Sequence, residues 1–321
     1  MKTTSKTILA ICILAMGAMT GNINAQPSVP LADGEWIIAA AKSKKNDAQA
    51  RKNTIVLWRA DNPDVINDRA EEICTIGMAR GPGDEFYESV EFEVHGITEL
   101  QSLVKLYILC GSISLDEDTY PMGMVAILDA QLKLVSLRYY REVRTFYSVY
   151  AQGSFYFVCG QMQPLYNNAA IVLRDNIAAP EIAPNIMGFY TPNGLGWAFH
   201  KITAKKDADQ VRAFEFDVQY QYADYEQALA SRQKNESKTN NTSPNPSKRG
   251  EQAPSLSERA GGEVQTKKIS FTVPTTIFED RQSMKHEITL PNDMKTADLT
   301  TFSIARIYIR GYVLPPLTKT K

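Results

Sequence analysis

Residues 124–175 read MVAILDAQLKLVSLRYYREVRTFYSVYAQGSFYFVCGQMQPLYNNAAIVLRD. Apolar runs of strand length, such as residues 156–160 and 170–175, alternate in this stretch with short polar or glycine-containing breaks. Several of the runs are too short for a helix, and β-branched and aromatic residues are frequent in them. Strand-length apolar runs bounded by turn residues predict an antiparallel β-structure.

The same layout occurs four times along the chain: a turn, an aromatic-led strand, a loop, and a second apolar strand that ends in an aspartate. The lead aromatics follow one another at steps of 71, 49 and 41 residues, and they are Trp36, Tyr107, Tyr156 and Trp197. Most of these strands lack strict alternation, which is typical of strands covered on both faces. Repeats of about 40–50 residues with several short strands each indicate the blades of a propeller.

Residues 124–175 also resemble the long-blade repeats of secreted bacterial β-propellers. The shared order is a strand, an Asp-centred turn, a strand, an aromatic pair, a Ser-Val strand, a Gly turn and a strand that ends in Gly. Arg141-Glu142 stands where that family usually has a doubled glycine, and weaker copies cover residues 33–61, 86–129 and 189–217. The resemblance implies a propeller-like all-β fold, and it implies no single activity.

We therefore predict an all-β, propeller-like fold of about five to six four-stranded blades, with a β-sandwich as the alternative. A blade cannot bury both faces alone, so each sheet has to pack on its neighbours. The repeats are expected in residues 26–230 and the remaining strands of the same domain in residues 269–314. Pro315-Pro316 is expected to stop the last strand and leave a tail at 315–321.

The N-terminus has the features of a secretory signal peptide. Lys2 and Lys6 precede an apolar run over residues 7–20, and small Ala25 precedes Gln26 at the expected cleavage point. The run is shorter than the about 20 residues that span a bilayer, although a retained anchor is the alternative. We expect residues 1–25 to be removed, no membrane span to remain, and the protein to be periplasmic or extracellular.

Residues 231–268 differ in composition from the rest of the chain. They contain few large apolar side chains and are rich in Ser, Asn, Pro, Lys, Glu and Gly. Such a segment cannot bury enough surface to order itself, which predicts a disordered insertion in a loop of the folded domain. A linker between two domains is the alternative, and a third interpretation is that the insertion has impaired the protein.

Composition and cysteine count restrict the class of protein further. The 321 residues are 44% apolar and 22% charged, with 36 acids against 35 Lys and Arg, which argues against a nucleic-acid binder. Three cysteines remain after signal removal, too few for a disulfide framework. Cys110 and Cys159 occupy the same place in adjacent repeats, and facing sheets lie about 10 Å apart. A disulfide needs a shorter separation, so both are predicted to be free thiols.

Catalytic and metal-binding signals are weak. His95, His200 and His286 are too far apart for a local metal motif, and no serine-hydrolase elbow, phosphate loop or dinucleotide fingerprint occurs. Asp116 and Asp118 could begin a calcium loop, but the required glycine and the distal acid are absent. The sequence therefore predicts no cofactor and identifies no catalytic residue.

Two functions remain open. The first is an exported, non-catalytic, propeller-like binding or scaffold protein whose protein or glycan ligand contacts the loops at 42–53, 112–123, 161–169 and 201–211. The first of these loops is basic, with Lys42, Lys44, Lys45, Arg51 and Lys52. The alternative is a secreted glycan- or peptide-processing enzyme, since two loop carboxylates need only meet in space.

Overall fold

The described part of the chain consists of β-strands and one short 3-10 turn. The computed structural model describes residues 26–43, 53–64, 66, 69–78, 90–101, 104–115, 120–163, 169–177, 184–190, 197–207, 210–223, 264–278, 285–289, 301–314 and 316–320. Within these residues there is no α-helix, and so no helix of the length and apolar character needed to cross a bilayer. The all-β class predicted from the sequence is confirmed.

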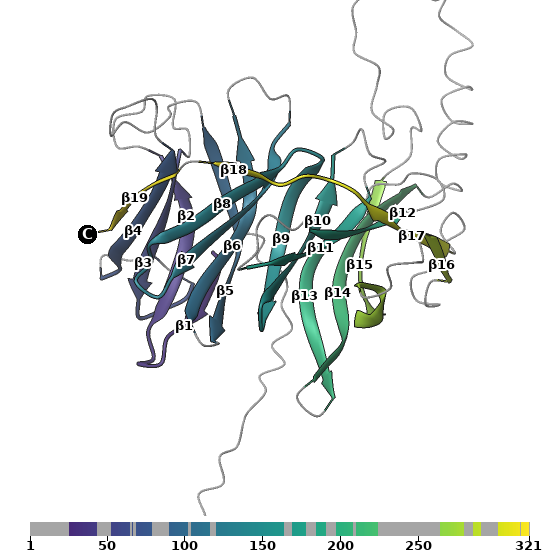
Figure 1. The fold of residues 1–321 in the computed structure, drawn as a ribbon, viewed down its shortest axis with the longest axis horizontal. Helices are drawn as coiled ribbons and strands as arrows, with labels where there is room; N and C mark the ends of the chain where they lie inside the picture. Colours follow the sequence, from purple (N-terminus) through teal and green to yellow (C-terminus); the bar gives the residue numbers. More distant parts are fainter. Residues whose placement is uncertain are drawn as a thin grey trace, which may run out of the picture.

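The strands form four antiparallel sheets, numbered here in chain order (Figure 1). Sheet 1 has the order β1 (Ser28–Pro30), β2 (Trp36–Lys42), β3 (Thr54–Ala60), β4 (Glu71–Met78) and β19 (Pro316–Thr320). Sheet 2 has the order β5 (Glu91–Gln101), β6 (Lys105–Ser114), β7 (Met122–Asp129), β8 (Leu134–Tyr140) and β18 (Tyr312–Leu314). In both, four consecutive strands form a meander and a C-terminal strand is added at the outer edge.

Sheet 3 also begins with a four-stranded meander but has two C-terminal strands added, and sheet 4 has three strands. Sheet 3 has the order β9 (Val143–Gln152), β10 (Phe155–Met162), β11 (Ala170–Asn176), β12 (Asn185–Tyr190), β17 (Thr301–Ile307) and β16 (Lys285–Thr289). Sheet 4 contains β13 (Trp197–Asp207), β14 (Gln210–Ala223) and β15 (Val264–Pro274), and the 3-10 turn Thr275–Phe278 follows it. The described residues thus form four sheets instead of the about five to six blades that were predicted.

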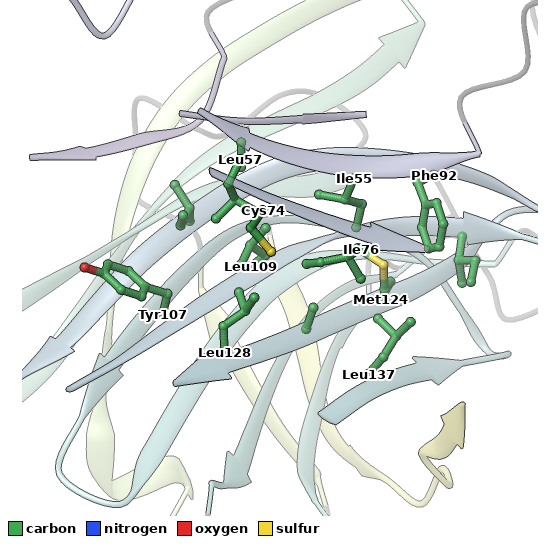
Figure 2. Close-up of a cluster of buried hydrophobic side chains, with 14 of the residues drawn as sticks. Ile55, Leu57, Cys74, Ile76, Phe92, Tyr107, Leu109, Met124, Leu128 and Leu137 are labelled. Carbon is green, nitrogen blue, oxygen red and sulfur yellow. The ribbon is translucent and has the colours of Figure 1, made fainter. Parts of the chain in front are cut away.

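The four sheets stack in chain order, and each space between neighbours holds one hydrophobic core. Figure 2 shows the first of these cores, where Ile55, Leu57 and Cys74 of sheet 1 meet Leu109 and Met124 of sheet 2. A second core lies between sheets 2 and 3, and a third lies between sheets 3 and 4. Sheets 2 and 3 are therefore covered on both faces, which explains why their strands lack polar alternation. Two packed layers, the sandwich alternative, do not describe this arrangement.

Sheet 4 ends the described stack with a polar face. On β13 and β14, Phe214 and Phe216 point into the core while Lys201, Thr203 and Asp217 are exposed on the other side. The alternation over residues 214–218 therefore belongs to a sheet with one solvated face.

The C-terminal segment adds one strand beside the fourth strand of each of three sheets. Strand β17 pairs with β12, β18 with β8 and β19 with β4, so the segment visits sheets 3, 2 and 1 in reverse order (Figure 1). The tail predicted at 315–321 thus contains a strand. Pro316 is tolerated there because it is the first residue of that strand.

Two predicted boundaries concern the signal peptide at residues 1–25 and the insertion at residues 231–268. Residues 1–25, with Ala25 of the expected cleavage point, lie outside the described residues, which start at Gln26. Of the predicted insertion, residues 231–263 lie outside them as well. Residues 264–268 belong to β15 and pair with β14, so the folded domain resumes five residues earlier than predicted.

A buried ion pair joins sheets 2 and 3 inside the second core. Arg138 on β8 donates a 2.5 Å hydrogen bond to Asp175 on β11, and their side chains are only 4% and 3% exposed. The hydroxyls of Tyr140 and Tyr156 also donate to the same carboxylate oxygen, at 3.2 and 2.9 Å. Burial raises the pKa of both tyrosines, so both remain protonated donors at neutral pH.

Candidate functional site

The first strand of sheets 2, 3 and 4 contains a β-bulge at the same place. The pairing register shifts on either side of His95 in β5, Tyr147 in β9 and His200 in β13, so these three residues are the extra residues of their bulges. A bulge leaves its extra residue outside the ladder and turns the strand locally. In each of three consecutive sheets, one residue with a ring side chain is thus left out of the backbone pairing, at an equivalent position.

Glycines on the second strand make room for two of these bulges. A Cβ atom on Gly111 would lie 1.9 Å from the carbonyl oxygen of Glu93, and one on Gly160 would lie 2.0 Å from the carbonyl oxygen of Thr145. Both glycines directly follow a cysteine, in the pairs Cys110-Gly111 and Cys159-Gly160. In these two sheets the Cys-Gly pair therefore indicates a bulge on the neighbouring strand.

The bulges correct the predicted fourth repeat. Gly96 and Ser148, which follow the bulges, pair with Cys110 and Cys159, and the corresponding Lys201 pairs with Asp217. The lead aromatics Tyr107 and Tyr156 lie three residues before those cysteines on second strands, and the matching residue before Asp217 is Phe214. Trp197 lies on a first strand, so taking it as the fourth lead aromatic is wrong.

The three bulge residues form a continuous row across three sheets, named here the bulge row. The ring of Tyr147 lies 5.4 Å from that of His95, centroid to centroid, and 4.3 Å from that of His200, on which it stacks. Their parent strands β5, β9 and β13 lie side by side and run in the same direction (Figure 1). A hydrogen bond of 3.3 Å from the backbone amide of Ile202 to Ser148 Oγ links β13 to β9 beside the row.

The bulge row lies at the surface and has charged neighbours. The His95 side chain is 30% exposed, and its Nε2 lies 3.4 Å from a carboxylate oxygen of Glu93, which also accepts a 3.2 Å hydrogen bond from Ser112. Burial is the main cause of the raised pKa of Tyr147, which the charge of Arg144 opposes. At neutral pH the row therefore presents a protonated phenol between two imidazoles, a surface suited to aromatic and hydrogen-bonding contacts.

The cysteines do not provide a reactive group. Cys74, Cys110 and Cys159 are free and buried. Burial raises the pKa of all three thiols, that of Cys74 to about 11, so they are protonated at neutral pH. Cys110 points into the core between sheets 2 and 3, and Cys159 points into the core between sheets 3 and 4. The thiol is therefore a packing group in each case, since the thiolate is the nucleophile.

These thiols predict that the protein loses stability at alkaline pH. Between pH 9 and each raised pKa, an unfolded chain has lost the thiol proton that the folded chain keeps, so stability falls as pH rises. Each thiol is expected to contribute a slope of about −1.4 kcal/mol per pH unit in that range. Urea unfolding under argon at pH 8, 9 and 10 measures the slope, and Cys110→Ala should make it shallower. An unchanged slope in that variant would contradict the assignment.

The other predicted site residues are not brought together. Asp116 and Asp118 lie outside the described residues, as do residues 44–52 of the basic loop and shorter stretches of the other three predicted loops. Lys42 ends β2, where its ammonium lies 3.2 Å from Glu72 and above the ring of Trp58. His286 lies on β16, the outermost strand of sheet 3, and is not part of the bulge row. Among the described residues, no group of three or more His, Cys, Asp or Glu could hold a metal ion.

The predicted loops also differ in where they lie. The loops at 42–53, 112–123 and 161–169 all join the second strand of a sheet to the third. The loop at 201–211 joins β13 to β14, the first strand to the second, and much of it belongs to these strands. In an antiparallel meander consecutive connections lie at opposite ends, so the fourth loop belongs to the other end of the stack.

The spacing of the three bulge residues in the sequence is a signal for the bulge row. His95, Tyr147 and His200 follow one another at steps of 52 and 53 residues, more regular than the steps between the lead aromatics. Separations of this length exclude a local motif, but they match the number of residues from the first strand of one sheet to the first strand of the next. In a repeat fold, residues one repeat apart lie side by side.

Comparisons with known proteins add no relatives. The chain matches no protein-family model, no curated protein and no solved structure.

Proposed function

We propose that this chain is an exported, non-catalytic binding or scaffold protein of propeller-like architecture, and that it binds its ligand along the bulge row. The observation that carries the proposal is the row itself, in which three ring side chains from three sheets lie side by side at the surface. Most other large aromatics of the stack are buried. Partly exposed rings at repeated positions are what a binding surface requires, while a core does not need them.

The propeller-like part of the proposal is supported by the way the sheets are built. Sheets 1 to 3 begin with a four-stranded meander, each sheet packs on the next, and the first strands of sheets 2 to 4 lie together. In a propeller the first strands line the centre, and the bulge row would then face that centre. The sandwich alternative offers no reason for equivalent bulges in three successive sheets.

The non-catalytic part rests on the chemistry of the described groups. The thiols are buried and protonated, and among the described residues the carboxylate that pairs with a member of the bulge row is that of Glu93, beside His95. Glycosidase chemistry needs two carboxylates about 5–10 Å apart.

A binding screen tests the proposal. The mature chain, residues 26–321, is applied to an array of polysaccharides and peptides, and bound members are retested with the double variant His95→Ala/His200→Ala. We expect the binding of at least one member to weaken at least about tenfold, equivalent to 1.4 kcal/mol. The matched control is His286→Ala, which changes the third histidine and should bind normally.

Three outcomes would count against the proposal. If every bound member binds the double variant as tightly as the parent, the row is removed from the site. Release of shortened products from a bound member would support the enzyme alternative. Mass spectrometry of protein recovered from the periplasm and medium should show Gln26 as the first residue, and a retained N-terminus would contradict export.

A further inference from the structure

A second cluster of side chains, which includes the exposed Arg141 and Arg310, lies at the outer edge of sheet 2, where the C-terminal segment pairs with β8. The ring of Tyr312 stacks on that of Tyr139, 5.2 Å away. The guanidinium carbons of Arg141 and Arg310 lie 5.1 and 6.0 Å from the centre of the same ring. Two arginines from distant parts of the chain thus converge on one tyrosine.

The surroundings of this cluster favour contact with a ligand. Arg141 and Arg310 are exposed, and no acidic residue of the described chain forms an ion pair with Arg310. Tyr308, two residues before Arg310, is 82% exposed, more than any other large hydrophobic residue among those described. We call Arg141, Tyr308, Arg310 and Tyr312 the arginine–tyrosine patch.

We propose that the arginine–tyrosine patch binds a carboxylate-bearing polysaccharide. The Arg310 guanidinium, beside the Tyr312 ring, can match a carboxylate with two parallel hydrogen bonds. The exposed Tyr308 ring adds a flat surface with a polar tip, suited to a sugar ring that has an apolar face and hydroxyl groups. Uronate sugars carry both features in every unit.

The edge of the sheet argues against an acidic peptide as the ligand. Strand β18 has only three residues, Tyr312–Leu314, and Pro315 and Pro316 follow it. Short edges next to proline offer few backbone hydrogen bonds for an added strand. Recognition at this edge therefore depends on side chains, and a peptide would lose its usual main-chain anchoring.

Titration of the mature chain with polygalacturonate, with neutral dextran and with polyglutamate tests this proposal. We expect binding to polygalacturonate alone, weakened about tenfold in Arg310→Ala and partly weakened in Arg310→Lys, which keeps the charge but loses the fork of donors. Arg212→Ala, at an exposed arginine of β14, is the matched control and should bind as the parent does. Since Arg310 is exposed, the melting temperature should be unchanged in all three variants.

The other results overturn the proposal. Equal binding to dextran and to polygalacturonate would show that the protein does not recognise the carboxylate. Unchanged binding of polygalacturonate to Arg310→Ala would place the ligand elsewhere. Binding to polyglutamate with the same dependence on Arg310 would assign the patch to acidic peptides. The double variant His95→Ala/His200→Ala should leave this binding intact, which separates the patch from the bulge row.

Discussion

Replacing Asp175 with alanine is expected to lower the free energy of unfolding by about 3–5 kcal/mol. The change leaves Arg138 buried and charged with no carboxylate, and two tyrosine hydroxyls lose their acceptor. Removing one partner of a buried pair costs far more than the pair contributes, because an unpaired charge stays away from water. Urea unfolding at pH 7 measures the loss.

The control for this prediction is an exposed pair of the same chemistry. Arg59 pairs with Asp33 and Glu35, and its side chain is 43% exposed. Asp33→Ala should cost much less than Asp175→Ala, because solvent screens that pair. The double variant Arg138→Ala/Asp175→Ala should lose less than the sum of the two single variants. Similar losses for Asp33→Ala and Asp175→Ala would show that the pair between sheets 2 and 3 is not buried.

Gly160→Ala and Gly111→Ala are each expected to destabilise the protein by about 3 kcal/mol, the upper range for overpacking. In both variants the added methyl group meets a backbone carbonyl oxygen of the bulged strand, at about 2 Å. A backbone group cannot rotate away as a side chain can, so the bulge itself has to shift. The two losses should be alike, because both glycines occupy the same place in successive sheets.

Gly153→Asn is the control for the two glycine variants. Gly153 has φ +60° in the β9–β10 turn, with no atom within 4 Å of an added Cβ. Asparagine tolerates this conformation better than most residues, so the loss should be below about 1 kcal/mol. The melting temperatures of the three variants test this prediction. A Gly160→Ala variant with an unchanged melting temperature would contradict the claim that the glycines make room for the bulges.

The sequence predicted the local elements well because each depends on nearby residues. Apolar runs without alternation placed β6, β7, β10 and β11 and indicated that both faces are covered. The lead aromatics Trp36, Tyr107 and Tyr156 do lie at equivalent places on second strands. Trp197 failed because a large aromatic that starts an apolar run occurs on first strands too, and only the pairing register separates the two cases.

The remaining features depend on contacts that one sequence does not reveal. The pairing of residues 301–320 with three outer edges has no local signal, because each strand there is short and takes its place from β12, β8 and β4. The bulge row depends on shifts in strand pairing register, which the hydrophobic pattern of a single strand does not show. Arg138 and Asp175 are charged residues within apolar strands, and their pairing is visible only once sheets 2 and 3 face each other.

The central claim is that similar sheets stack in chain order, so that equivalent residues of successive sheets touch. Proton NMR on the mature chain tests this directly, since the protein has only three histidines and His→Gln variants assign their ring signals. We predict nuclear Overhauser effects from the Tyr147 ring to the rings of both His95 and His200, because the centroids lie 5.4 and 4.3 Å away. A Tyr147 ring that shows contacts to neither histidine would contradict the stacked arrangement.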